Sequence, residues 1–130
     1  MILIDTSAWI EHFNGRGTPA AERVRRALDD EQVIVGDLVM VELLQGVRFD
    51  KEVARILVDI KALRRESLCG AAIGLLAAAN YRGLRRRGIT IRSTIDVIIA
   101  TWCIENGAAI IHNDRDMAVM EAQLGLRAYA

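Results

Sequence analysis

Short runs that are apolar at every position alternate along the chain with longer stretches of mixed polarity. Three of these runs, residues 2–4, 33–35 and 109–111, are typical of strands buried on both faces of a sheet. Two weaker segments, residues 67–68 and 126–128, are predicted as a brief strand and a final edge strand. Such short strands, separated by longer stretches, favour a sheet whose strands are joined by helices.

The stretches between the runs carry the start and stop signals of helices. Asp5-Thr6-Ser7 and Asp37 are typical N-terminal caps, and glycines such as Gly46 and Gly88 are typical stops. Helices are predicted over residues 6–13, 19–28, 37–45, 50–64, 70–87, 94–106 and 114–124. The alternation indicates an α/β protein, a three-layer α/β/α sandwich with a central, mostly parallel sheet. Because the 130 residues contain no repeat or linker, residues 1–130 are expected to form one domain.

The composition excludes several classes of protein. Hydrophobic residues make up 52% of the chain, which argues against disorder. The uncharged run over residues 67–81 is shorter than the roughly 18–20 apolar residues of a membrane span. The N-terminus lacks the basic region of a signal peptide. Cys69 and Cys103 have no metal-ligand spacing, so both are expected to be buried free thiols of a cytoplasmic protein.

Arginine is concentrated in one part of the chain, although the formal net charge is +0. Only Lys51 and Lys61 are lysines, and the stretch from Arg82 to Arg92 holds five arginines and no acid. Arginine is a planar, bidentate donor to phosphate, so this stretch is a candidate contact for a nucleic-acid backbone. A simpler explanation is the solvated C-terminal end of a helix, where cations are favourable.

Three carboxylates stand in segments that are otherwise apolar. Asp5 is the one charged side chain of residues 1–10, and Asp96 is the one charged side chain of residues 93–104. Glu42 likewise stands alone in the apolar helix LVMVELLQG. A buried, unpaired carboxylate is costly or becomes protonated, and such a group usually has a cation as its partner.

The predicted topology brings these acids close to two others. Asp5 follows the first strand, and Asp114 and Asp116 follow the last buried strand. Because sites in parallel sheets lie outside the carboxyl ends of the strands, acids from four segments are expected at one rim. Their repulsion would be severe without a metal ion, and carboxylate oxygens suit Mg²⁺ or Mn²⁺. His12 and His112 form no zinc motif and are predicted to make polar contacts near the ends of elements.

Each acid also has a simpler explanation. Asp5 and Asp114 could serve only as helix N-caps. Asp96 could be a first-turn acid that the helix dipole stabilises, and Glu42 could pair with an arginine such as Arg92. These explanations are independent of one another, whereas a metal site accounts for all of the acids together. We therefore prefer the metal site.

Four sequence segments, in this order and spacing, carry a resemblance that covers essentially the whole chain. They are MILIDTSAWIEHF, VMVELLQG, TIRSTIDVIIATWCIENGA and IIHNDRDM. They resemble the PIN-domain ribonucleases, and more closely the VapC-type toxins of bacterial type II toxin–antitoxin pairs. The resemblance implies an α/β/α sandwich and a Mg²⁺- or Mn²⁺-dependent endoribonuclease that hydrolyses phosphodiester bonds in RNA.

The resemblance also assigns roles to the acids. The positions that match the acids of the family are Asp5, Glu42, Asp96 and Asp114, with Asp116 at a fifth, less uniform position. Asp5 and Asp96 are expected to bind a first metal ion directly, and Asp114 and Asp116 to complete that site or hold a second ion. Glu42 is expected to bind through water or to position the nucleophile.

Residues outside the acidic cluster receive expectations as well. Thr6 or Ser7 matches the small hydroxyl that supports the site, and Met117 stands where the family often has an aromatic residue. Arg92 is expected to steer phosphate. The arginines expected to hold the RNA backbone are Arg82, Arg85 and Arg86. The resemblance further implies a homodimer and inhibition by a cognate antitoxin, in a heterotetramer or larger assembly. No contact with a membrane is expected, because no uncharged run is long enough to span one.

Two other classes of protein remain open. The first is a catalytically inactive PIN-like module that binds RNA or protein, against which the intact acids argue. The second is a phosphatase with an aspartate nucleophile after the first strand, similar to haloacid-dehalogenase-like enzymes. Those enzymes carry a second aspartate two residues later, where this chain has Ser7. Only the phosphatase would form a phosphoryl intermediate on Asp5.

Overall fold

The computed structural model describes residues 1–30 and 32–130. The strands are β1 (Ile2–Ile4), β2 (Val33–Gly36), β3 (Arg64–Glu66) and β4 (Ala109–Ile111). The helices are α1 (Thr6–Phe13), α2 (Pro19–Asp30), α3 (Asp37–Gln45), α4 (Asp50–Lys61), α5 (Gly70–Arg86), α6 (Thr94–Asn106) and α7 (Arg115–Leu124).

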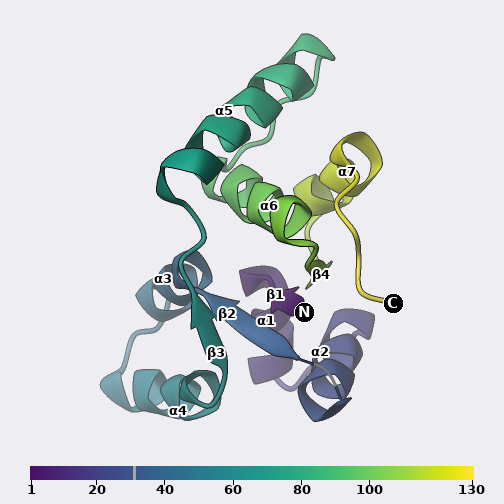
Figure 1. Ribbon diagram of the computed structural model, residues 1–130. Coiled ribbons are helices and arrows are strands. Elements are labelled where there is room, and N and C mark those ends of the chain that lie inside the picture. The colour runs from purple at the N-terminus through teal and green to yellow at the C-terminus, as the bar shows by residue number, and fades with distance from the viewer. Residues whose placement is uncertain (31) are drawn as a thin grey trace.

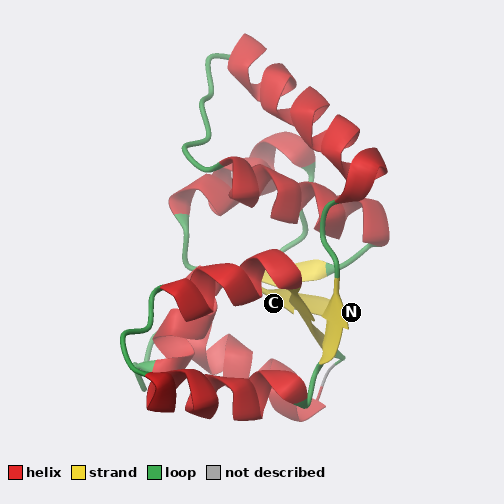
Figure 2. Cartoon of the chain, turned by 90° about the vertical axis from the view of Figure 1, so that its left-hand side faces the viewer, coloured by secondary structure: helices red, strands yellow, loops and turns green. Residues whose placement is uncertain are grey.

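The strands form one parallel sheet in the order β3-β2-β1-β4. In the central strand, Leu3 pairs with Ile34 of β2 on one side and with Ile110 of β4 on the other. Helices α5, α6 and α7 lie on one side of the sheet, and α1, α2 and α4 lie on the other (Figures 1 and 2). The predicted three-layer α/β/α sandwich with a parallel sheet is therefore confirmed.

The central strands are apolar because they lie inside the hydrophobic core. Every residue of β1 and β2 is buried, and both layers of helices add side chains to the same core. Trp9 of α1 and Ile99 of α6 are fully buried examples from the two sides. Burying each large apolar side chain contributes about 1.5–3 kcal/mol to the stability of the fold. The core therefore keeps the strands in place, with their carboxyl ends along one edge of the sheet.

The prediction for the middle of the chain was wrong in two respects. Helix α4 ends at Lys61 rather than near Arg64, and the strand that follows is Arg64–Glu66 rather than residues 67–68. β3 is an edge strand that pairs only with β2, and both of its arginines are exposed, so it has no apolar pattern. Leu68 is instead a buried residue whose N–H donates to Asp37 Oδ1 at 3.0 Å.

Three smaller predictions concern the end of the chain and the cysteines. The expected edge strand over residues 126–128 is reduced to a single parallel bridge between Ala128 and Ile110. Cys103 is buried as expected, but Cys69 is exposed, because it lies in the connection that precedes α5. No described helix is both long and apolar enough to cross a membrane.

Candidate active site

Asp5 is the most deeply buried acid of the site. It follows β1, caps α1, and uses Oδ2 to accept hydrogen bonds from the Ser7 hydroxyl at 2.6 Å and the Ser7 N–H at 3.2 Å. Its other oxygen, Oδ1, is buried and has no hydrogen-bond partner among the described residues. Burial raises the pKa of Asp5, while the bonds from Ser7 oppose this shift. The Oδ1 oxygen therefore has no partner among the described residues, and a bound cation would be one.

Glu42 reaches the same place from α3. Its Oε1 accepts a hydrogen bond from the Thr6 hydroxyl at 2.9 Å, which ties the helix to the first residue of α1. Burial raises the pKa of Glu42, and the negative charges of Asp5 and Asp114 raise it further. The alternative pairing of Glu42 with Arg92 is not formed; Arg92 lies beside Asp116 instead.

Asp96 lies in the first turn of α6, where the Ser93 hydroxyl accepts its backbone N–H at 3.4 Å and caps the helix. Asp96 as a residue is 9% exposed. Burial, followed by the charges of Asp5, Asp114, Glu42 and Asp116, raises the pKa of Asp96 to about 7. The carboxyl therefore experiences the whole negative cluster around it.

Asp114 and Asp116 complete the acidic rim after β4. Asp114 caps α7, because its Oδ1 accepts the backbone N–H of Asp116 at 2.7 Å. Asp116 Oδ2 accepts the backbone N–H of Arg92 at 3.2 Å, and the exposed Arg92 side chain places Nε 3.8 Å from the same oxygen. Arg92 thus contributes the one guanidinium of the described residues within 4 Å of these five acids.

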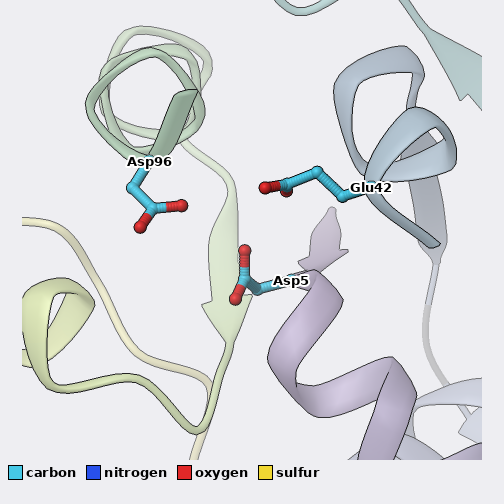
Figure 3. A group of neighbouring side chains, drawn as sticks. All are labelled: Asp5, Glu42 and Asp96. Atoms are coloured by element: carbon cyan, nitrogen blue, oxygen red, sulfur yellow. The ribbon is translucent and has the colours of Figure 1, made fainter. Parts of the chain in front are cut away.

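The acids form two overlapping groups. Asp5, Glu42 and Asp96 offer oxygens that lie within 4.8 Å of one another, and their carboxylates face a common space in Figure 3. Asp96, Asp114 and Asp116 form a second group by the same measure. All five acids that the sequence singled out are therefore brought together, and Asp96 belongs to both groups. Oxygen donors at this density suit a hard divalent cation.

The arginines at the end of α5 are placed differently from the acids. Arg82, Arg85 and Arg86 are exposed, and within the described residues none of them pairs with an acid. Arg85 lies over the Tyr81 ring, 5.9 Å from its centroid. Arg82 lines a hollow of about 300 Å³ between α5 and α6, which it shares with Thr94 of the first turn of α6.

Two residues of the β4–α7 loop were missed as supports of the site. The Asn113 N–H donates to the Ser7 hydroxyl at 2.9 Å and thereby links the loop to Asp5. His112, expected only to make polar contacts, accepts the N–H of Asp114. Their position between a buried strand and an acidic helix cap was the available signal, but neither residue type marks such a role alone.

Comparison with known proteins decides the family. The family model described as PIN domain matches residues 2–122. The chain belongs to the PIN domain family. It is 37% identical to VapC ribonuclease Mb1587 of Mycobacterium bovis and to Ribonuclease VapC11 of Mycobacterium tuberculosis, over 98% of this chain and 97% of each relative.

The PIN domain fold also matches a solved structure. VapBC-1 from nontypeable Haemophilus influenzae is similar with a TM-score of 0.75 and 19% identity, over 99% of this chain and 97% of that chain. The fold and the resemblance to VapC-type PIN-domain ribonucleases, predicted from the sequence, are therefore confirmed. The roles of individual acids in this PIN domain remain predictions.

Proposed function

We propose that this PIN domain, residues 1–130, is a Mg²⁺- or Mn²⁺-dependent endoribonuclease that acts as the toxin of a toxin–antitoxin pair. The observation that carries the proposal is the overlap of two acid groups at Asp96, one of which includes Asp5, whose buried Oδ1 has no hydrogen-bond partner among the described residues. The 37% identity to named VapC ribonucleases over nearly the full length supports the same activity.

The donor set fits a divalent metal ion. Three carboxyl groups have raised pKa values because they are buried near like charges, and a bound cation would offset both effects by stabilising the ionised carboxylates. Asp5 and Asp96 would hold a first ion directly, and Asp114 with Asp116 would complete that site or hold a second one. When bound, such an ion lowers the pKa of a water molecule and neutralises charge that develops on phosphoryl oxygens.

Other residues of the chain position these ligands. Ser7 orients Asp5 through two hydrogen bonds, and Thr6 orients Glu42 through one, so these bonds favour the arrangement in which the two acids face the same space. Glu42 would bind through water or orient the attacking water. Arg92, with its exposed guanidinium beside Asp116, would attract the phosphate to be cleaved.

The test of the activity is cleavage of total RNA by the purified protein. Wild type should give discrete products with Mg²⁺ or Mn²⁺ and none with EDTA, and Asp96→Asn should lower the rate at least about a hundredfold because it removes a ligand shared by both acid groups. Asp59→Asn, an exposed acid of α4, is the matched control.

The other outcomes distinguish the remaining alternatives. Equal silence of wild type and Asp96→Asn, after complete removal of any antitoxin, would favour an inactive RNA- or protein-binding module. Activity that survives both EDTA and Asp96→Asn would contradict the metal mechanism. A phosphoryl group trapped on Asp5 would instead indicate a phosphatase.

The unpaired arginines of α5 are proposed to hold the RNA backbone. In an Asp96→Asn background, which allows binding to be measured without cleavage, Arg85→Gln with Arg86→Gln should weaken RNA binding. The slope of log K against log salt should fall by about 1.4, because each lost phosphate contact in single strands contributes about 0.7. Arg48→Gln with Arg55→Gln, two exposed arginines elsewhere, should leave the slope unchanged. An unchanged slope in the Arg85 and Arg86 variant would exclude this contact.

A protein antitoxin is the proposed partner, since the similar VapBC-1 structure and the VapC relatives carry the names of such systems. A homodimer, and a heterotetramer or larger complex with antitoxin, are further proposals. Exposed apolar side chains give the physical reason for association, among them Leu75 at 76% and Leu76 at 41% exposure. A cytoplasmic location, with RNA as substrate and no membrane contact, completes the proposal.

A further inference from the structure

A histidine–glutamate pair lies behind the loop that carries Asp114. His112 directly follows β4, and its side chain is only 11% exposed. Its Nδ1 accepts the backbone N–H of Asp114 at 3.2 Å. Its Nε2 contacts Oε2 of Glu121, which lies in the second turn of α7. The imidazole thus joins the end of the strand, the start of the loop and the body of the next helix.

The two contacts of His112 determine where its ring proton lies. A nitrogen that accepts an N–H carries no proton, so Nε2 must be the protonated nitrogen and must donate to Glu121. The Glu121 carboxylate can only accept, and it therefore selects the form of the ring that can hold the Asp114 N–H. Without Glu121 the ring could place its proton on Nδ1 and would then face the N–H of Asp114 with another donor.

Asp114 is consequently held at two points. Its backbone N–H is bound by His112, and its Oδ1 is bound by the Asp116 N–H in the cap of α7. These constraints fix the residue while it keeps an oxygen within 4.8 Å of the oxygens of Asp96 and Asp116. Groups that orient a metal ligand in this way typically change metal affinity by about 10–100-fold when they are removed.

We infer that His112 and Glu121 act as a positioning pair that sets the affinity of the acidic site for its divalent ion by fixing the backbone of Asp114. The inference deepens the proposed function and rests on it. The bond from His112 goes to the backbone of Asp114, so the pair acts through that residue rather than as a metal ligand.

The test measures the binding of Mn²⁺ to the full-length protein, either by calorimetry or from the electron paramagnetic resonance signal of the free ion. His112→Asn places an acceptor oxygen where Nδ1 stood and loses the reach to Glu121. His112→Gln places its amide where Nε2 stood and loses the acceptor for Asp114. Glu121→Ala removes the group that selects the ring form, and Glu105→Ala on the exposed end of α6 is the matched control.

The inference predicts a definite order of affinities. His112→Asn should bind Mn²⁺ within about threefold of wild type, and Glu105→Ala should equal wild type. His112→Gln and Glu121→Ala should bind about tenfold or more weakly. The thermal midpoint of each metal-free variant reports folding, and Glu121→Ala decides the outcome if a His112 variant does not fold.

Two results would overturn the inference and can be told apart. Wild-type affinity in folded Glu121→Ala and His112→Gln, or equal losses in His112→Asn and His112→Gln that follow their thermal midpoints, would leave the pair a structural role only. Absence of saturable Mn²⁺ binding in the wild type would remove the metal site itself and the inference with it.

Discussion

Asp96 is the acid of the site whose pKa is raised by the most neighbouring carboxyl groups. It is nearly buried, it belongs to both groups of acids, and four other carboxyl groups raise its pKa after burial has done so. Asp5 and Glu42 are shifted in the same direction for the same main reason. At the scale of single residues, the site is therefore a set of carboxyl groups whose raised pKa values favour the protonated form unless a bound cation takes the place of the protons.

This leads to a prediction about pH and metal. Between its usual pKa of 3.8 and about 7, Asp96 binds a proton in the folded protein that the unfolded chain has released. The contribution of Asp96 to the free energy of unfolding of the metal-free protein should therefore fall as pH rises through this window. Stabilisation by Mg²⁺ should grow over the same window and reach about 2.7 kcal/mol when the free ion exceeds its Kd about a hundredfold.

Chemical denaturation at several pH values, with EDTA and with Mg²⁺, measures both effects. Asp96→Asn has no carboxyl group to titrate, so its unfolding free energy should depend less on pH and respond less to Mg²⁺. Glu105→Gln, on the exposed end of α6, should behave like wild type. A steeper dependence on pH in Asp96→Asn than in wild type would contradict the assignment.

The connection between β2 and α3 shows how the elements position Glu42. Gly36 ends β2, and a Cβ at this position would lie 2.1 Å from Cδ1 of the fully buried Leu68. Leu68 is itself held by its N–H bond to Asp37, the first residue of α3. The element that carries Glu42 therefore starts where the Leu68 side chain packs directly against the backbone of Gly36.

Replacement of this glycine tests the close approach. Gly36→Ala should lower the free energy of unfolding by about 1–3 kcal/mol, because the fully buried Leu68 must shift within the core to make room for the methyl group. Gly17→Ala is the matched control, since a Cβ at that position meets nothing within 4 Å. Urea denaturation of both variants measures the difference. Equal stabilities would mean that the core adjusts around Leu68 without cost.

At the scale of the whole molecule, some large apolar side chains are left exposed on the surface. The described surface exposes large apolar side chains on α5, where Leu75 is 76% and Leu76 is 41% exposed, and other residues of this helix line the apolar hollow between α5 and α6. A helix with such a face gains from contact with another surface. We therefore place the proposed contact between two copies of the chain on α5.

Light scattering at micromolar concentration checks this placement. Wild type should have about twice the 14.4 kDa mass of one chain. Leu75→Asp should shift the protein to the monomer, because it introduces a charge into the apolar contact. Val58→Asp, at a similarly exposed apolar position of α4, should remain a dimer. A strict monomer in the wild type would contradict the dimer, and a dimeric Leu75→Asp would exclude α5 as its interface.

The sequence alone determined the strands of the core and the candidate acids. β1, β2 and β4 are readable because a strand buried on both faces must be apolar at every position. Asp5, Glu42 and Asp96 are readable because a charge in an apolar segment is costly and calls for an explanation. These are local properties of composition, so neighbouring residues suffice to reveal them.

Only the tertiary structure decided the features that depend on distant segments. β3 is polar and becomes a strand because the edge of β2 offers it hydrogen bonds. Asp96 stands at the overlap of both acid groups, and Glu121 fixes Asp114 through His112, because packing brings these residues together. A pattern along the chain records what each residue prefers, whereas the partner that satisfies it is set by the packing of the whole fold.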